Sequence, residues 1–60
     1  MPALLKVNNC FYLDEKGSTM FSVVAFIRLN GLFDDPQLRI LIIEEVREIF
    51  PNIRILEEEN

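Results

Sequence analysis

Three kinds of side chain in this sequence carry groups that could do chemistry: a thiol, an aspartate doublet and a glutamate run. Cys10 is a potential nucleophile, but the chain contains no histidine to activate it. Asp34 and Asp35 stand before Pro36, and residues 57–59 are all glutamate. Carboxylates hold a hard cation only where about six oxygens surround it. We therefore expect no metal or cofactor site, Cys10 as a small hydrophobic residue without chemical activity, and the aspartates as helix-capping groups.

Met1 and Pro2 offer a different chemistry. Removal of Met1 would leave Pro2 as an N-terminal secondary amine, which acts as a base or nucleophile when a dry environment keeps it neutral. In this feature, and in its length, the chain resembles the small tautomerases, and the resemblance implies catalysis by Pro2. The likeness covers little more, because no arginine cluster stands nearby and the second element reads as a strand instead of a helix. A tautomerase-like enzyme is therefore an alternative, and we expect the protein not to be an enzyme.

Asn8 and Asn9 stand side by side in a segment that otherwise alternates like a strand. Because asparagine is depleted in strands, the pair marks either a β-bulge or a polar contact site. A contact site that includes Tyr12 would make the chain a ligand- or nucleic-acid-binding open sheet, which is a second alternative. The six basic residues are scattered and the net charge is −4, which opposes phosphate binding. We therefore expect no nucleic-acid partner.

The composition indicates one small domain. Sixty residues, 50% hydrophobic and 27% charged, suit a single domain over 1–60 with a solvated acidic tail at 57–60. The apolar runs are far shorter than the ~20 residues of a membrane helix, and too short at the N-terminus for a signal peptide. We therefore expect a cytoplasmic protein that does not contact a membrane.

The stability of so short a chain favours a partner subunit. One cysteine allows no internal disulfide. A core of this size provides only ~3–5 kcal/mol of net folding stability.

The first half of the chain predicts a β-hairpin. Apolar and polar residues alternate over 3–13 and again over 19–30, which is the period of a strand. The polar segment 14–18 between them has hairpin length, and Gly17 can take the positive φ that a short hairpin needs. The pattern breaks at Asn30 and Gly31.

The second half predicts a helix and a short strand. Asp35 is suited to the N-cap and Pro36 to the first helical position, so a helix is expected over 37–50, ended by Pro51. Residues 52–57 alternate as a third strand. The predicted fold is α+β, in the order ββαβ, with an antiparallel or mixed three-stranded sheet. We expect the strand order 2-1-3, the third strand parallel to the second, and one helix on one face.

One helix on one sheet face cannot bury all the apolar residues. The predicted two-layer core consists of Leu5, Val7, Phe11, Leu13, Phe21, Val23, Ala25, Ile27, Leu29, Leu38, Leu41, Ile42, Val46, Ile49, Ile53 and Ile55. The remainder consists of Leu4, Cys10, Tyr12, Met20, Val24, Phe26, Phe33, Ile40, Ile43 and Leu56. Either loops, chain ends and sheet twist cover this remainder, or it forms an interface.

The apolar surplus predicts a non-enzymatic protein-interaction module, either a small homodimer or an accessory, regulatory or inhibitor-like subunit of a larger protein. Aromatic and Met side chains are enriched in interface cores. We expect the interface at Tyr12, Met20, Val24, Phe26, Ile40 and Ile43. A twofold dimer could stack free sheet faces or pair edge strands, the second strand among them. The acidic flank formed by Glu44, Glu45, Glu48 and the tail would steer the chain toward a basic patch.

Overall fold

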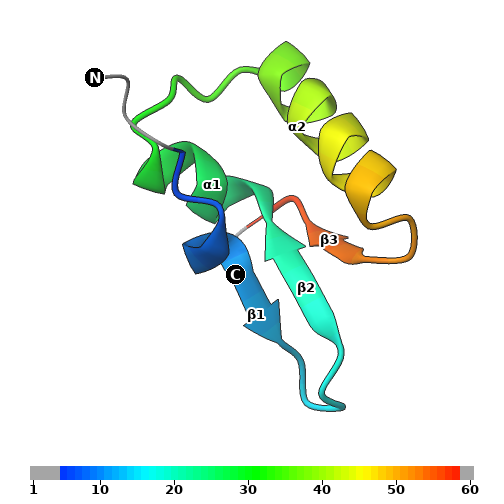
Figure 1. The fold of residues 1–60 in the computed structure, drawn as a ribbon. Coiled ribbons are helices and arrows are strands. Elements are labelled where there is room, and N and C mark those ends of the chain that lie inside the picture. Colours follow the sequence, from blue (N-terminus) through cyan, green and yellow to red (C-terminus); the bar gives the residue numbers. More distant parts are fainter. Residues whose placement is uncertain (1–4, 59–60) are drawn as a thin grey trace.

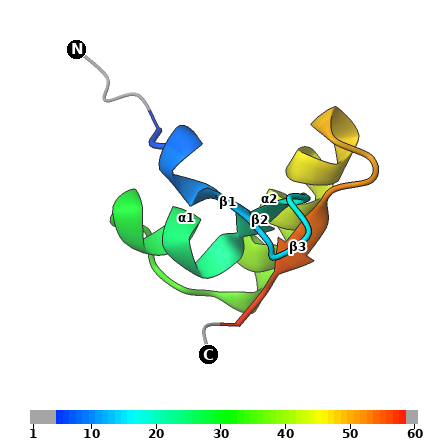
Figure 2. The same ribbon diagram turned by 90° about the horizontal axis from the view of Figure 1, so that it is seen from below.

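The computed structural model describes residues 5–58, which form a three-stranded sheet with two α-helices and a short 3₁₀ turn (Figure 1). The elements in chain order are η1 (Asn8–Cys10), β1 (Phe11–Leu13), β2 (Thr19–Ser22), α1 (Val23–Leu29), α2 (Pro36–Ile49) and β3 (Arg54–Leu56). In Figures 1 and 2, η1 and α1 lie toward the β1 edge of the sheet, and α2 lies toward the β3 edge. The expected α+β class is confirmed.

The sheet is mixed, with β2 in the centre. β1 pairs antiparallel with β2, so that Tyr12 lies opposite Met20. β3 pairs parallel with β2, so that Met20 lies beside Arg54. The third strand runs parallel to the second, as expected. The predicted order 2-1-3, in which these two strands are not neighbours, is wrong, because the order is β1-β2-β3. The reason lies in burial: Phe21 of β2 is fully buried, and a strand with neighbours on both sides provides that environment.

The hairpin between β1 and β2 follows the sequence prediction. The Asp14 carboxylate accepts hydrogen bonds from the backbone N–H groups of Lys16 at 2.9 Å and Ser18 at 2.8 Å. Gly17 has the expected positive φ, at 82°. The local turn residues therefore fix the register of this strand pair.

The predicted second strand, 19–30, is wrong beyond Ser22. Only Thr19–Ser22 is a strand, and Val23–Leu29 forms the helix α1 without any intervening loop. The Ser22 hydroxyl accepts a hydrogen bond from the Ala25 N–H at 3.1 Å, which is an N-cap. A helix capped by Ser22 therefore begins inside the alternating apolar sequence, and the fold has two helices instead of one.

The C-terminal end of α1 is closed by a Schellman motif. Gly31 has φ 63°, the left-handed conformation that favours glycine. The Leu32 N–H donates to the Ile27 carbonyl at 2.9 Å, and the Gly31 N–H donates to the Arg28 carbonyl at 3.2 Å. Both bonds satisfy carbonyls that a helix end otherwise leaves without partners.

The predicted first strand, 3–13, is also too long. Of its described part, only Phe11–Leu13 is a strand, and Asn8 and Asn9 lie in the 3₁₀ turn η1 instead of a β-bulge. Residues 1–4 and 59–60, which include Pro2, Leu4 and Glu59, lie outside the described residues.

The helix α2 begins as predicted. The Asp35 carboxylate accepts a hydrogen bond from the Gln37 N–H at 2.8 Å, and Pro36 occupies the first helical position. Five hydrophobic residues of the described chain are buried: Cys10, Phe21, Val23, Ile27 and Ile42. This core joins η1, β2, α1 and α2, and the Phe11 ring packs edge-on against Phe21 at 5.1 Å between centroids. Six of the sixteen predicted core residues are exposed: Leu5, Val7, Leu13, Leu29, Leu41 and Ile49. The other ten are buried or pack against the buried cluster, and Cys10, expected outside the core, lies within it.

Candidate interaction surface

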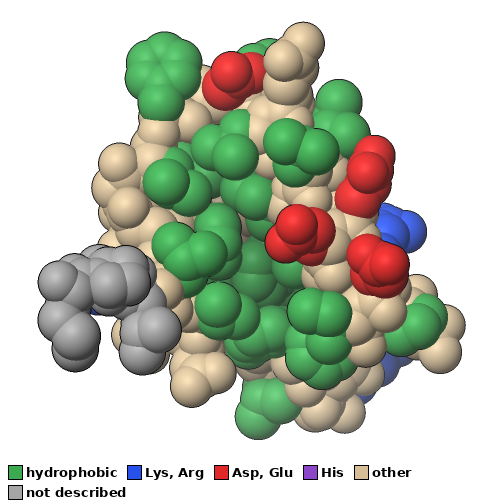
Figure 3. Space-filling view, turned by 45° about the horizontal axis from the view of Figure 1, so that its top comes forward, with side chains coloured by type: hydrophobic (Ala, Val, Ile, Leu, Met, Phe, Trp, Pro, Cys, Tyr) green, Lys and Arg blue, Asp and Glu red, His purple; other side chains and the backbone are tan. Residues whose placement is uncertain are grey.

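A groove with almost entirely apolar walls opens between the η1–α1 side of the molecule and α2. Its volume is about 390 Å³. We call it the apolar groove, and it is lined by Leu5, Val7, Phe21, Phe26, Leu32, Leu38, Leu41, Ile42, Glu45, Val46 and Ile49. Figure 3 shows hydrophobic side chains gathered over this hollow, with acidic side chains along one side of it.

The helix α2 supplies one wall of the apolar groove. Leu38, Leu41 and Ile42 recur at helical spacing, and Ile49 continues the same stripe two turns further on. Ile42 turns into the core and is only 7% exposed, whereas Leu41 is 58% and Ile49 70% exposed. Leu41 and Ile49, two of the five apolar residues of α2 that line the groove, are therefore available to contact another molecule.

The floor of the apolar groove is aromatic. Phe21 comes from β2 and Phe26 from α1, and their ring centroids are 5.9 Å apart. Phe21 is fully buried beneath the floor, while Phe26 is half-buried. The base of the groove is therefore formed by two packed rings, one from a strand and one from a helix.

The opposite wall includes Leu5 and Val7, just before η1. The Lys6 N–H donates to the Asn30 side-chain oxygen at 2.6 Å, and the Asn30 amide nitrogen donates to the Phe26 carbonyl at 2.9 Å. Asn30 therefore attaches the segment before η1 to the end of α1. Leu5 remains 58% exposed on this wall.

The charge around the apolar groove is acidic. Glu45 is its one charged lining residue among residues 5–58, and it is exposed on α2. Glu44 and Glu48 are also exposed on α2, and their spacing places them on the flank next to Glu45. A molecule seated in the groove would therefore meet carboxylates along the α2 side.

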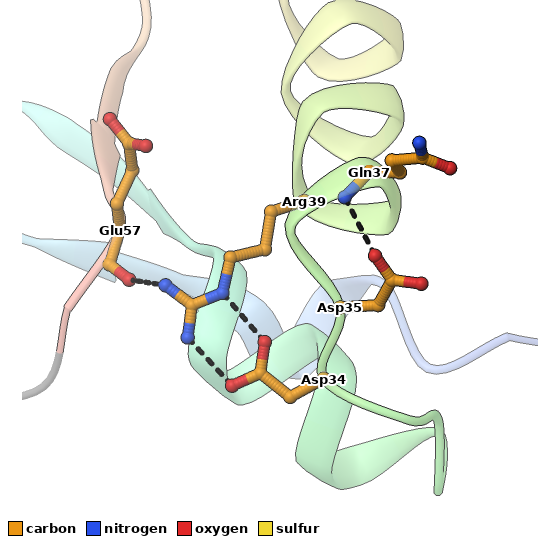
Figure 4. Close-up of polar contacts among 5 residues, drawn as sticks. All are labelled: Asp34, Asp35, Gln37, Arg39 and Glu57. Atoms are coloured by element: carbon orange, nitrogen blue, oxygen red, sulfur yellow. Dashed lines mark hydrogen bonds and ion pairs between the residues drawn. The ribbon is translucent and has the colours of Figure 1, made fainter.

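Arg39, although it belongs to α2, is engaged away from the groove (Figure 4). Its guanidinium donates to both Asp34 carboxylate oxygens, at 2.7 and 2.8 Å, and to the Glu57 carbonyl at 2.6 Å. The hydrogen bonds and charge of Arg39 lower the pKa of Asp34. This clamp joins the start of α2 to the chain just after β3.

The sheet carries a second exposed surface. The register places Tyr12, Met20 and Arg54 side by side across the three strands, on the face opposite Phe21. Tyr12 is 45% exposed and Met20 is half-buried. This face is less apolar than the groove because Arg54 lies in the row.

The six predicted interface residues do not come together in one surface. Tyr12 and Met20 lie on the free sheet face, and Val24 lies in α1 near Tyr12. Phe26 lines the apolar groove. On α2, Ile40 is exposed and Ile43 packs against the core. Val24 and Phe26 were expected on a strand face, which is wrong because Ser22 starts a helix there. Their role as an interface stays a prediction.

Sequence reasoning missed that Leu5, Leu41 and Ile49 are exposed, and assigned all three to the core. One signal was available. Glu45 lies one turn after Leu41 and one turn before Ile49, on the same helical face. A carboxylate in the middle of an apolar stripe indicates that this part of the stripe is in contact with water.

The residues with potential chemistry lie in more than one part of the structure. Cys10 is fully buried, its thiol donates to the Lys6 carbonyl at 3.1 Å, and burial raises its pKa. Residues 5–58 contain no cluster of three or more metal-ligating side chains. Asp34 and Glu58 do come together along one pocket with Arg39, whose guanidinium binds the Asp34 carboxylate, whereas Cys10 lies in the core.

Comparison of the chain with protein-family models, curated protein sequences and solved structures gave no significant match. Within the described range, no helix is both long enough and apolar enough to cross a membrane.

Proposed function

We propose that this chain is a non-enzymatic protein-interaction module. The observation that carries the proposal is the exposure of large apolar side chains on the surface of the chain. Within residues 5–58, ten large hydrophobic side chains are exposed, and four of them, Leu5, Val7, Leu41 and Ile49, line the apolar groove. Exposed apolar patches of more than a few hundred Å² are rare on monomers and mark interaction sites.

The apolar groove is the principal binding surface in this proposal, because it joins exposed leucine and isoleucine side chains to an aromatic floor. The free sheet face, with Tyr12 and Met20, is a secondary surface suited to pairing of two copies. In this function the chain is an accessory or regulatory subunit in the cytoplasm, and it acts by binding to a larger partner protein.

Site-specific photo-crosslinking in cells of the source organism tests the proposal. A photoreactive side chain replaces Leu41 in the apolar groove, and a matched variant carries it at Leu13, which is 72% exposed but lies outside the groove. We expect a discrete protein adduct from position 41 and none from position 13. The absence of any adduct from position 41, or the same diffuse adducts from both positions, contradicts the proposal.

A further inference from the structure

The apolar groove has features that select one class of occupant, and this inference rests on the function proposed above. The first feature is its length. The wall formed by α2 runs from Leu38 to Ile49, which at 1.5 Å per residue is about 16 Å, or three helical turns. That length matches a short helix laid along α2, with apolar side chains at i, i+3 or i+4, and i+7 directed to the floor.

The second feature is the position of charge. Glu45 stands in the groove wall, and Glu44 and Glu48 continue the acidic flank. Arg39 does not join this flank, because its guanidinium is held by Asp34 and by the Glu57 carbonyl. The other basic residue of α2, Arg47, is exposed next to Glu48 and is outnumbered by the three carboxylates. A helix seated here gains from Lys or Arg side chains on the edge that faces α2.

The same charges oppose a second copy of this chain as the occupant. Two α2 helices paired antiparallel about a twofold axis would bring the two Glu45 carboxylates together near the middle of the contact. Like charges facing each other in an interface are destabilising, and each chain already carries a net charge of −4. The acidic flank therefore favours a partner of opposite charge.

We propose that the apolar groove binds an amphipathic helix of a different protein, about three turns long, with an apolar face and a basic edge. The apolar face covers Leu41, Ile49 and the Phe26 floor, and the basic edge lies along Glu45 and Glu48.

A displayed peptide library tests this proposal with the purified full chain. The library fixes apolar residues at helical spacing over about 12 positions and randomises the edge positions among Lys, Glu and Gln. Peptides are selected on the native chain, and their affinity is then measured for four variants by fluorescence anisotropy. The groove variants are Leu41→Ser and Glu45→Lys, and the matched controls outside the groove are Leu13→Ser and Glu15→Lys. Circular dichroism verifies that each variant is folded.

The selected peptides should carry Lys at the edge. Their affinity should fall about tenfold for Leu41→Ser and Glu45→Lys, and change less than about twofold for the controls. Peptides with Glu at the edge should bind Glu45→Lys more tightly than the native chain. Since Glu15→Lys makes the same change in net charge, a general attraction between opposite charges would affect both variants equally.

The proposal is overturned if the library yields no binder, if the selected edges are neutral or acidic, or if groove and control variants bind equally. Light scattering of the native chain and of Leu41→Ser separates this failure from failure of the proposed function. A dimer that Leu41→Ser dissociates would make a second copy the occupant, so the inference fails and the interaction function stands. A monomer with no library binder and no adduct from position 41 would contradict both.

Discussion

Asn30 and Arg39 are the two polar side chains that hold the walls of the apolar groove in place. Asn30 attaches the segment with Leu5 and Val7 to the end of α1 through a 2.6 Å hydrogen bond. Arg39 attaches the start of α2 to Asp34 and to the chain after β3. Each side chain contacts two segments that are distant in sequence, so each restricts the opening of the groove.

The Arg39 clamp predicts a pH-dependent stability. Because Asp34 is ionised more easily in the folded chain, its pKa lies below the ordinary value of about 3.9. The stability that the chain gains from the Asp34–Arg39 pair is fully present at pH values above that ordinary value. It is lost as the pH falls through the lower pKa that Asp34 has in the folded chain. Arg39→Ala should therefore lower the thermal unfolding midpoint at pH 7, and the difference should shrink near pH 3.

Arg47→Ala is the matched control for this prediction, because it removes the same charge from an exposed position of α2. Thermal unfolding followed by circular dichroism at several pH values makes the comparison. Equal effects of the two substitutions, or an Arg39 effect that does not change with pH, would contradict the clamp.

Cys10 provides a residue-scale prediction about reactivity. The thiolate is the reactive form, and burial both raises the thiol pKa and blocks access. A thiol-specific reagent at pH 8 should therefore modify the native chain slowly and the urea-unfolded chain rapidly. A native rate as fast as the unfolded one would show that Cys10 is accessible.

At the scale of elements, α1 depends on its two ends. The helix has only seven residues, and isolated helices of that length are marginal in water. The Ser22 cap and the Schellman motif at Gly31 therefore contribute much of its definition. Because α1 carries Phe26 and ends at Asn30, its ends also determine the shape of the apolar groove.

Substitution at either end of α1 should destabilise the fold. Ser22→Ala removes the cap at a cost of about 1 kcal/mol. Gly31→Ala should cost about 1–2 kcal/mol from the left-handed backbone alone, because the added Cβ would meet no atom within 4 Å. Urea unfolding measures both, with Ser18→Ala in the exposed hairpin as the control. Losses no larger than that of Ser18→Ala would contradict the helical assignment of 23–29.

The sequence predicts those elements whose end signals agree with their hydrophobic period. Asp35 and Pro36 begin α2 as expected, and Gly17 forms the expected turn. At α1 the two signals disagree: Val23 and Val24 are β-branched and favour a strand, whereas the Ser22 cap favours a helix. Here the cap and the core environment of Val23 outweighed the intrinsic preference.

The sequence predicts that an apolar interaction surface exists, but it does not predict where that surface lies. The surplus of apolar residues is visible in the sequence, but its location depends on how closely α2 approaches the sheet. Leu41 and Ile49 have the spacing of core residues, yet α2 leaves them at the edge of an open groove. Periodicity identifies the apolar face of a helix without showing how much of that face another element covers.

At the scale of the whole molecule, the buried core is small relative to the exposed apolar surface. Phe21 is the largest fully buried side chain and contacts the rings of both Phe11 and Phe26. So small a domain has a net stability of only ~3–5 kcal/mol. A partner that covers the apolar groove would add binding free energy to this stability.

Phe21→Ala should unfold the isolated chain. The substitution costs about 3–5 kcal/mol, which equals the whole stability expected for a domain of this size. Phe33→Ala, at a position that is 83% exposed, should change the stability by less than about 0.5 kcal/mol. Circular dichroism of both variants makes the comparison, and a folded Phe21→Ala variant would show that the core is larger than the structure indicates.

The proposed function requires that the apolar groove stands open in the isolated chain, ready for a partner. Methyl NMR of the dilute chain with a soluble paramagnetic agent tests it most directly, since the agent broadens only methyl groups that solvent reaches. We predict strong broadening for the methyl groups of Leu41 and Ile49, and little for buried Ile42 on the same helix. Equal shielding of all three would mean that the chain covers the groove with its own residues, and would contradict the account.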